Sequence, residues 1–358
     1  MDKADIPSIT NMSLAEVEAL CASLDEPSYR AKQILSWMYS KGATTFDQMS
    51  DLPEYLRKKL SENCRIFRTR INVHTQTGDG TRKFLIILPN GNEIECVLLR
   101  EGKRITACVS TQVGCAMACR FCASGKSGLE RNLTTGEIVE QALHIKEHIH
   151  PEERLTHIVF MGIGEPLANY DNVIKAIRIM NANWGLGIGA RHITISTVGI
   201  ISGISRLAQE GIQINLAISL HAPDDIIRSK IIPSNKKASI SNILKAAREY
   251  FSLTRRDISF EYILIDKINA SLHDAESLAR LLKGLRCNIN LLPLNPIEGC
   301  SFRPPSRETI EIFRKTLEKH GLVVTVRKKK GGSIHAACGQ LRLQNINFYG
   351  KHKKFFVK

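Results

Sequence analysis

From about residue 104 onwards, short apolar segments alternate with longer segments whose apolar residues recur at helical spacing. Short apolar runs predict buried strands, and helical spacing predicts amphipathic helices. Strands are expected at residues 105–110, 156–161, 191–197, 213–220, 258–265, 288–294 and 322–327. Helices are expected at residues 135–149, 171–182, 200–209, 239–251, 273–284 and 306–320.

A regular alternation of strand and helix is typical of right-handed β-α-β units, which place their strands side by side in a parallel sheet. Six or seven such units predict an α/β fold with an incomplete (β/α)6-type barrel. A doubly wound open sheet is the alternative that the same alternation allows. In a barrel, functional residues are expected at the carboxyl ends of the strands.

The first hundred residues follow a different pattern. Ser13 and Glu16 are spaced as a capping box that begins a short helix, and apolar spacing predicts two more helices at 28–41 and 52–63. Two apolar strands follow within 82–99, on either side of an Asn-Gly pair that favours a hairpin turn.

These patterns divide the chain into three parts. We expect a small N-terminal α+β accessory domain over residues 1–100, the barrel over 101–340 and a basic tail over 341–358. With 358 residues and 43% apolar content, the chain is long enough for about two domains with a sizeable core.

Composition narrows the class of protein. No apolar run approaches the roughly 20 residues that a membrane-spanning helix needs. The N-terminus also lacks the basic-then-apolar order of a signal peptide, so we expect a cytoplasmic protein with no membrane partner. The formal net charge of +15 favours a nucleic-acid partner, because phosphate contacts release condensed counterions. A basic surface without such a partner is the alternative.

Three of the ten cysteines, Cys115, Cys119 and Cys122, lie within eight residues, directly after a predicted strand. Because disulfides are rare in the cytosol, this cluster indicates metal or redox chemistry. A structural zinc ion needs four ligands. Three thiolates on a cubane cluster instead leave one iron open, which can chelate the amino and carboxylate groups of S-adenosylmethionine (SAM). The spacing favours an iron–sulfur cluster, with a zinc knuckle completed by Cys108 or a histidine as the alternative.

Glycine and polar residues follow several of the predicted strands. Residues 161–166 read Met-Gly-Ile-Gly-Glu-Pro, which lacks the third glycine of a dinucleotide-binding fingerprint. Taken singly, such residues are more typical of turns, caps and satisfied core groups. Taken together at the ends of successive strands, they predict one ligand-binding rim, built from Gly164, Glu165, Ser196, Ser219, Leu220, His221 and Asn295.

Two other residues carry chemistry but give weaker signals. Cys338 follows the last predicted strand, and the nearby Lys328–Lys330 run could lower the pKa of its thiol. Alternation along the second hairpin strand places Glu95 on the opposite face from its neighbours Ile94 and Cys96. By residue type alone, Glu95 is typical of an exposed strand glutamate, and Cys338 of an inert thiol.

The motifs together resemble the RlmN/Cfr family of radical SAM RNA methyltransferases. The resemblance runs over nearly the whole chain and is carried by SYRAKQILSWMYSKG, TFDQMSDLPEYLRKKL, CVSTQVGCAMACRFCASG, FMGIGEPLANY, ITISTVG, LAISLHAP, LLPLNP and IHAACGQL. It implies an incomplete barrel with an N-terminal accessory domain for RNA. It further implies that Cys115, Cys119 and Cys122 hold a [4Fe-4S] cluster and that the rim residues hold SAM.

The resemblance also gives roles to the remote residues. Cys338 would carry the methyl group as a nucleophile, Cys108 would resolve the adduct through a disulfide with Cys338, and Glu95 would accept the ring proton. The implied reaction is methylation of adenine C2 in 23S rRNA and tRNA through S-methylcysteine, with two SAM consumed per methyl group.

Two alternatives accompany this reading. The Cfr branch of the family methylates C8 of the rRNA adenine, and Pro166 favours the C2 branch. Outside the family, an RNA-binding protein with a structural metal would explain the charge and the cysteines. The family resemblance also implies an electron donor such as a flavodoxin or ferredoxin, and a monomeric enzyme.

Overall fold

A computed structural model describes residues 6–126, 128–297, 299–327, 334 and 339–341. The N-terminal part is helical, with α1 (Leu14–Ser23), α2 (Tyr29–Tyr39) and α3 (Glu54–Asn63). The expected capping box is present, because the Ser13 side chain accepts from the Glu16 amide while the Glu16 carboxylate accepts from the Ser13 amide. All three predicted N-terminal helices are therefore confirmed.

The central feature of the fold is one ten-stranded sheet with the order β1-β2-β3-β4-β7-β8-β9-β10-β11-β12. Its antiparallel part consists of β1 (Arg70–Gln76), β2 (Arg82–Ile87) and β3 (Glu93–Glu101). Its parallel part consists of β4 (Arg104–Cys108), β7 (His157–Phe160), β8 (Ile193–Thr197), β9 (Asn215–Ser219), β10 (Ile258–Leu264), β11 (Cys287–Pro293) and β12 (Val323–Val326). Every strand predicted beyond residue 104 is confirmed.

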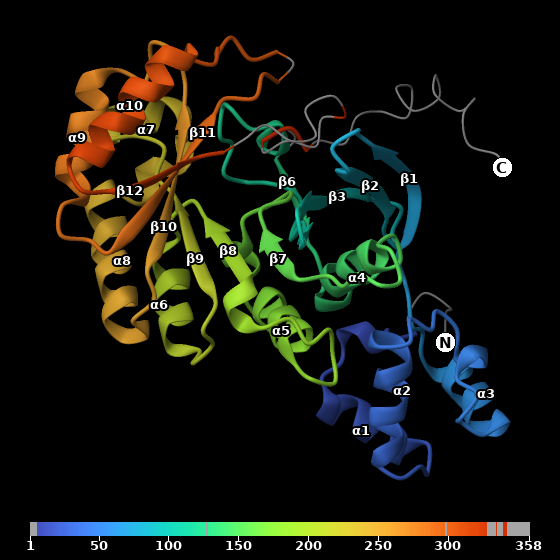
Figure 1. Cartoon of the computed structure of the whole chain (residues 1–358). Helices are drawn as coiled ribbons and strands as arrows, with labels where there is room; N and C mark the ends of the chain where they lie inside the picture. The colour runs from blue at the N-terminus through green and yellow to red at the C-terminus, as the bar shows by residue number, and fades with distance from the viewer. Residues whose placement is uncertain (1–5, 127, 298, 328–333, 335–338, 342–358) are drawn as a thin grey trace.

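The parallel strands follow one another across the sheet in chain order. A doubly wound sheet would reverse its strand order near the middle, and this sheet does not. The arrangement is an incomplete (β/α) barrel, as predicted. Figure 1 shows α5, α6, α8 and α9 along one side of the strands, which leaves the other side as the barrel interior.

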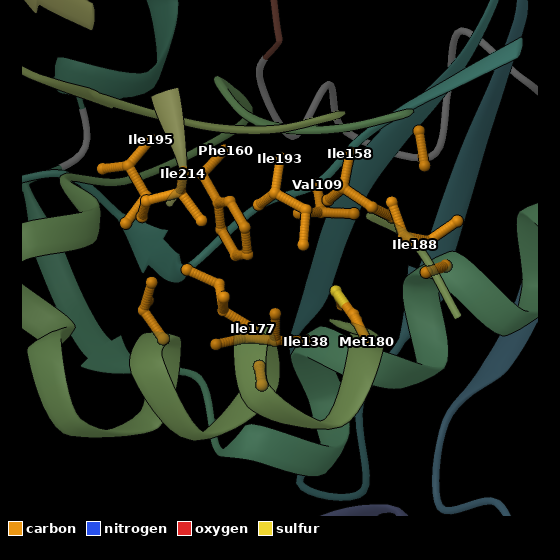
Figure 2. Close-up of a cluster of buried hydrophobic side chains, with 14 of the residues drawn as sticks. Val109, Ile138, Ile158, Phe160, Ile177, Met180, Ile188, Ile193, Ile195 and Ile214 are labelled. Carbon is orange, nitrogen blue, oxygen red and sulfur yellow. The ribbon is translucent and has the colours of Figure 1, made fainter. Parts of the chain in front are cut away.

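Helices connect the parallel strands, and the predicted ones are all present. Their bounds are α4 (Thr135–Lys146), α5 (Tyr170–Asn181), α6 (Ile201–Gln209), α8 (Ile240–Thr254), α9 (Leu272–Leu282) and α10 (Arg307–Lys319). Their apolar faces pack on the sheet, and Figure 2 shows Ile177 and Met180 of α5 below Phe160, Ile193 and Ile158 of the strands. Among the described helices, none is long and apolar enough to cross a membrane.

Three elements were not predicted from the sequence. The edge strand β1 reads RINVHTQ, and its half-exposed, mostly polar residues give little apolar contrast. Helix α7 (Asp225–Ile231) is only seven residues long, too short to show a helical period. The third element is a small hairpin, β5 (Gln112–Gly114) and β6 (Leu129–Asn132), which is separate from the main sheet.

The predicted hairpin joins the barrel sheet directly. Strand β3 pairs antiparallel with β4, with Val97 opposite Cys108 and Glu101 opposite Arg104. The expected domain boundary at residue 100 therefore falls at the end of β3, inside a continuous sheet, and it stays a proposal. This pairing brings side chains of the N-terminal hundred residues onto the barrel interior.

A buried carboxylate on α4 joins the N-terminal segment to the barrel. Glu140 is 1% exposed and accepts from the Thr10 hydroxyl at 2.7 Å, the Thr69 amide at 2.8 Å and the Arg68 amide at 3.1 Å. The Ser8 hydroxyl also donates to it at 3.3 Å. One side chain thus satisfies donors from two separate parts of the N-terminal region.

Replacing this carboxylate should destabilise the fold. In Glu140→Ala, the buried amide of Thr69 and the half-buried amide of Arg68 lose their acceptor. We expect a loss of about 3 kcal/mol in the free energy of unfolding, measured by urea denaturation. Glu249→Ala, at an exposed position of helix α8, is the control and should change stability by less than about 0.5 kcal/mol. Equal stability of the two variants would show that Glu140 is not an anchor.

Candidate active site

The three clustered cysteines lie in a loop that the hairpin β5–β6 closes. The Cys115 amide donates to the Gly128 carbonyl at 2.7 Å, at the base of the loop. Ala118, in the middle, has a φ of +53°, and a Cβ on Gly125 would lie only 3.0 Å from the Ala118 Cα. A side chain at residue 125 would therefore crowd the backbone of Ala118 and Cys119, which shows that the loop is tightly folded.

Contacts from distant segments hold the loop in place. The Arg120 amide donates to the carbonyl of Ile231, the last residue of α7, at 2.9 Å. The Ala123 amide donates to the Gly339 carbonyl at 2.8 Å, and the Ser124 hydroxyl donates to the Leu341 carbonyl at 2.7 Å. The C-terminal segment therefore lies against the cysteine loop.

Burial and mutual repulsion make the thiols hard to ionise without a bound cation. The pKa of Cys115 is raised to about 12, chiefly by burial and also by the charges of Cys122 and Glu165. The pKa of Cys119 is also raised, chiefly by burial and then by the charges of Cys122 and Cys115. A metal centre would reverse this shift, because a coordinating thiol is deprotonated.

The donor set fits an iron–sulfur cluster. It consists of three neighbouring soft sulfur atoms on one loop, the ligands that such clusters prefer. Within the residues that the structure describes, no three His, Cys, Asp or Glu side chains are arranged to hold a single metal ion.

Glu165 occupies the predicted rim, between the cysteine loop and β8. Its side chain is 4% exposed and accepts from the Leu167 amide at 3.1 Å and the Val198 amide at 2.8 Å. Burial raises its pKa to about 6, so the carboxylate is largely ionised at neutral pH. The Thr197 side chain also donates to this carboxylate. The carboxylate can still accept from an ammonium group, since its two oxygens offer about four lone-pair positions and these three bonds use three of them.

The glycines before Glu165 serve packing. A Cβ on Gly162 would lie 2.6 Å from the Ser110 hydroxyl and 2.7 Å from the Val109 carbonyl carbon. A Cβ on Gly164, which has a φ of +108°, would lie 2.7 Å from the Gln112 Cβ. The backbone thus approaches the chain segment that leads into the cysteine loop. A role for Gly164 in holding SAM stays a prediction.

His221 links the rim to β10 and to the cysteine loop. Its φ is +62°, its Nδ1 accepts from the Ile263 amide at 3.0 Å, and its ring meets Phe121 edge-on at 5.0 Å. Burial and the Arg228 charge lower the pKa of this imidazole to about 3, so it is neutral. The Phe121 ring packs within an apolar cluster that includes Ile231 and Ile263.

The remaining rim residues lie at the ends of neighbouring strands. Ser196 and Ser219 are half-buried on β8 and β9, and Leu220 is fully buried. Asn295 is half-buried just after β11. Their positions match the predicted barrel edge, while their contact with SAM stays a prediction.

The barrel interior contains a cavity of about 770 Å³. Cys108 and Asn295 line it, together with Met161, Glu261 and Leu341. Glu261 was not predicted as a site residue, because no sequence motif marks a single glutamate within an apolar strand as functional. Burial raises the pKa of Glu261 to about 7, and Asn290 donates to its carboxylate at 2.9 Å.

The structure brings Glu95 and Cys108 to the same part of the site. Val97 pairs with Cys108 across β3 and β4, and side chains two residues apart on a strand share a face, so Glu95, Val97 and Cys108 face one side. Val97 and Cys108 line the cavity. The Ser110 hydroxyl donates to the Glu95 carbonyl at 2.6 Å, which places Glu95 beyond the carboxyl end of β4.

Glu95 is fully buried, so the expectation of an exposed strand glutamate is wrong. Its carboxylate forms an ion pair with the ammonium of Lys83 on β2 at 2.8 Å, and both side chains are at most 5% exposed. Lys83 is a second residue that sequence reasoning missed, since a lysine in an apolar strand looks like a solvent-facing position. The attraction between the two groups offsets part of the cost of burying each charge.

Cys338 and residues 342–358 of the expected tail lie outside the described residues. No disulfide joins any two of the nine cysteines in the part of the chain that the structure describes. A permanent structural disulfide is thus unsupported. The Cys108–Cys338 disulfide remains a prediction, as a bond that forms only transiently during catalysis.

Comparison with known proteins agrees with this geometry. Residues 109–282 match the Radical SAM superfamily, and residues 8–66 match the ribosomal RNA large subunit methyltransferase N-terminal domain. The probable dual-specificity RNA methyltransferase RlmN of Rhodopirellula baltica is 47% identical, over 93% of this chain and 90% of that protein. The chain belongs to the RlmN family. Another relative, the RlmN of Syntrophus aciditrophicus, is 46% identical over 93% of this chain and 96% of its own length.

A solved structure supports the assignment of RlmN-family architecture. A radical SAM methyltransferase from Sphaerobacter thermophilus superposes with a TM-score of 0.92 at 44% identity, covering 94% of this chain and all of that one. Members of the radical SAM superfamily use a [4Fe-4S] cluster and SAM, which are the cofactors of this enzyme. Cys115, Cys119 and Cys122 would hold the cluster.

The Lys83–Glu95 pair predicts a specific pattern of stability. Lys83→Met leaves a buried unpaired carboxylate and should lower the free energy of unfolding by about 3–5 kcal/mol. The double variant Lys83→Met/Glu95→Met removes both charges and should recover most of that loss. Chemical denaturation of both variants measures the difference, with Lys58→Met, at an exposed position, as the control. Equal losses in the single and double variants would contradict a direct pairing.

Proposed function

We propose that this enzyme methylates C2 of adenine in 23S rRNA and tRNA through an S-methylcysteine, consuming two SAM per methyl group. The observation that supports it best is the placement of Glu95 and Cys108 on one face, at the strand end that leads into the cysteine loop. A thiol and a carboxylate beside a radical-generating centre are the groups that such a transfer needs.

The first requirement is a radical source shielded from water. When bound, the cluster supplies the electron that cleaves SAM and yields a 5′-deoxyadenosyl radical. Cys115, Cys119 and Cys122 would hold the cluster on the tight loop. Gly164, Glu165, Ser196, Ser219, Leu220, His221 and Asn295 would bind and orient SAM. In this assignment, the Glu165 carboxylate accepts from the SAM ammonium group.

The second requirement is a carrier, because C2 of adenine is not nucleophilic and cannot attack a methyl donor directly. The Cys338 thiolate would take the methyl group of one SAM and release S-adenosylhomocysteine. The 5′-deoxyadenosyl radical from the second SAM would remove a hydrogen atom from the S-methyl group, and the resulting thiomethylene radical would add to C2 of the ring. The adduct would then lose one electron. The Glu95 carboxylate would then remove the ring proton. The Cys108 thiolate would attack the Cys338 sulfur, which forms a disulfide between these cysteines and breaks the bond from sulfur to the methylene carbon. That carbon would take up a proton, and the methylated base would be released. An external dithiol reductant would restore both thiols.

RNA as the substrate is supported by several features. The matched relatives are named dual-specificity RNA methyltransferases, and residues 8–66 match an rRNA methyltransferase domain. The net charge of +15 suits a polyanionic partner. We assign residues 1–100 to RNA binding, 101–340 to the catalytic barrel and 341–358 to a basic tail. The RlmN names of the relatives and Pro166, buried beside Glu165, favour C2 over C8.

The proposed reaction also requires an electron donor and access to RNA in the cell. Cluster reduction needs an external one-electron donor, for which a flavodoxin or ferredoxin is suitable. We place the enzyme in the cytoplasm, where rRNA and tRNA are found, and propose that it acts as a monomer.

The resolving role of Cys108 gives the sharpest test. Cys108→Ala should accumulate a covalent protein–RNA adduct, because the Cys338–base bond then has no thiol to break it. Denaturing gels with labelled RNA would show a slower protein band that ribonuclease removes. Cys287→Ala, a substitution of a half-buried cysteine outside the cysteine loop, should release methylated RNA normally. Recovery of only free RNA from the Cys108 variant would refute this role.

The proton-accepting role of Glu95 is tested separately. Glu95→Gln keeps the shape of the side chain but loses the base, so we expect single-turnover formation of 2-methyladenosine to slow by about 10²–10⁴. Glu93→Gln, on the same strand and half-buried, should keep the original rate. A rate within threefold of the unaltered enzyme in Glu95→Gln would assign the proton transfer to another group.

A further inference from the structure

Arg228 on α7 is the largest of the fully buried side chains, at 1% exposure. A permanently charged group is costly to remove from water unless hydrogen bonds and an opposite charge compensate it. Burial lowers the pKa of its guanidinium to about 10, so the group keeps its charge at neutral pH. A cation at this depth needs an explanation.

Among the described residues, the acceptors of the Arg228 hydrogen bonds are neutral, and three of the four lie at the strand ends of the rim. Its Nε donates to the Leu220 carbonyl at 2.9 Å, and its Nη2 donates to the carbonyls of Val198 at 2.6 Å and Ser219 at 3.1 Å. Its Nη1 donates to the Asn235 side-chain carbonyl at 2.6 Å. The guanidinium thus ties together the ends of β8 and β9, but these contacts do not neutralise its charge.

Two features lie close to Arg228: the Asp225 carboxylate and the cysteine loop. Asp225 lies on the same helix, and its Oδ1 accepts from the Asn235 side chain at 3.0 Å and the Ile240 amide at 2.9 Å. Cys119 and Cys122 pack against the apolar cluster that contains Ile231, which follows Arg228 on α7. The backbone contact from Arg120 to Ile231 fixes the loop to the carboxyl end of this same helix.

We propose that Arg228 is a positioning residue for the iron–sulfur cluster. The buried positive charge of Arg228 favours the reduced state of the cluster, and the hydrogen bonds of Arg228 hold the strand ends of the rim in place. The inference rests on the proposed binding of the cluster by Cys115, Cys119 and Cys122. One-electron reduction adds a negative charge to the cluster, and a fixed cation nearby in a poorly solvated site stabilises that charge. Removing the cation therefore makes reduction harder.

The experiment is a redox titration of the anaerobically reconstituted full chain without SAM, followed by electron paramagnetic resonance. Arg228→Gln should make cluster reduction about tenfold less favourable, which corresponds to a midpoint potential about 59 mV more negative. Arg228→Lys keeps a charge and should show less than half of that shift. Asn235→Ala removes a hydrogen-bond partner but no charge, and its potential should stay at the original value.

The measured potentials distinguish an effect of the Arg228 charge from a structural effect and from absence of the cluster. An unchanged potential in a cluster-loaded Arg228→Gln variant overturns the role of the charge. If that variant does not fold, Arg228→Lys decides: a potential near the original supports the proposal, and a tenfold loss overturns it. A shift in Asn235→Ala equal to that in Arg228→Gln would assign the effect to structure and also overturn it. Absence of a reducible cluster in the unaltered chain would instead refute the proposed function.

Discussion

The antiparallel pairing of β3 with β4 connects the two halves of this enzyme. Strand β4 is the first parallel strand of the barrel, and its register with β3 places Glu95 near the barrel edge and Val97 opposite Cys108. A slip of one residue would turn Glu95 toward the apolar side of the sheet, where Cys96 is now buried. The hairpin is therefore part of the catalytic structure as well as a connection to the N-terminal helices.

Buried charge is the second property of the site. Lys83 and Glu95 form an ion pair below the surface, while Arg228 and Glu165 bond mainly to backbone groups at the ends of the strands. Each of these groups costs free energy to bury, and each lies close to a place where the proposed reaction moves an electron, a proton or a charged substrate. The enclosed environment strengthens their electrostatic effect compared with exposed groups.

The sequence was sufficient for the barrel and for the cysteine loop, because alternating strands and helices and a dense cysteine motif are local signals. It was insufficient for Lys83, Arg228 and Glu261. Their importance depends on burial by segments far away in the chain, and no spacing rule marks a charged residue as buried. Gly162 and Gly164 differ from these residues, because their motif was recognised in the sequence. Their close packing against residues 109–112, however, could not be predicted from the motif. Short α7 and edge strand β1 lacked enough periodicity to be recognised.

Transfer of a methyl group to C2 of adenine in RNA is the reaction on which the proposed roles of Glu95, Cys108 and Cys338 depend. It can be measured by mass spectrometry of nucleosides from 23S rRNA and tRNA that have been incubated anaerobically with reconstituted protein, reductant and SAM. We expect 2-methyladenosine in both RNAs and 5′-deoxyadenosine as a co-product. Formation of 8-methyladenosine, or intact SAM and unmodified RNA despite a reduced cluster, would refute this reaction.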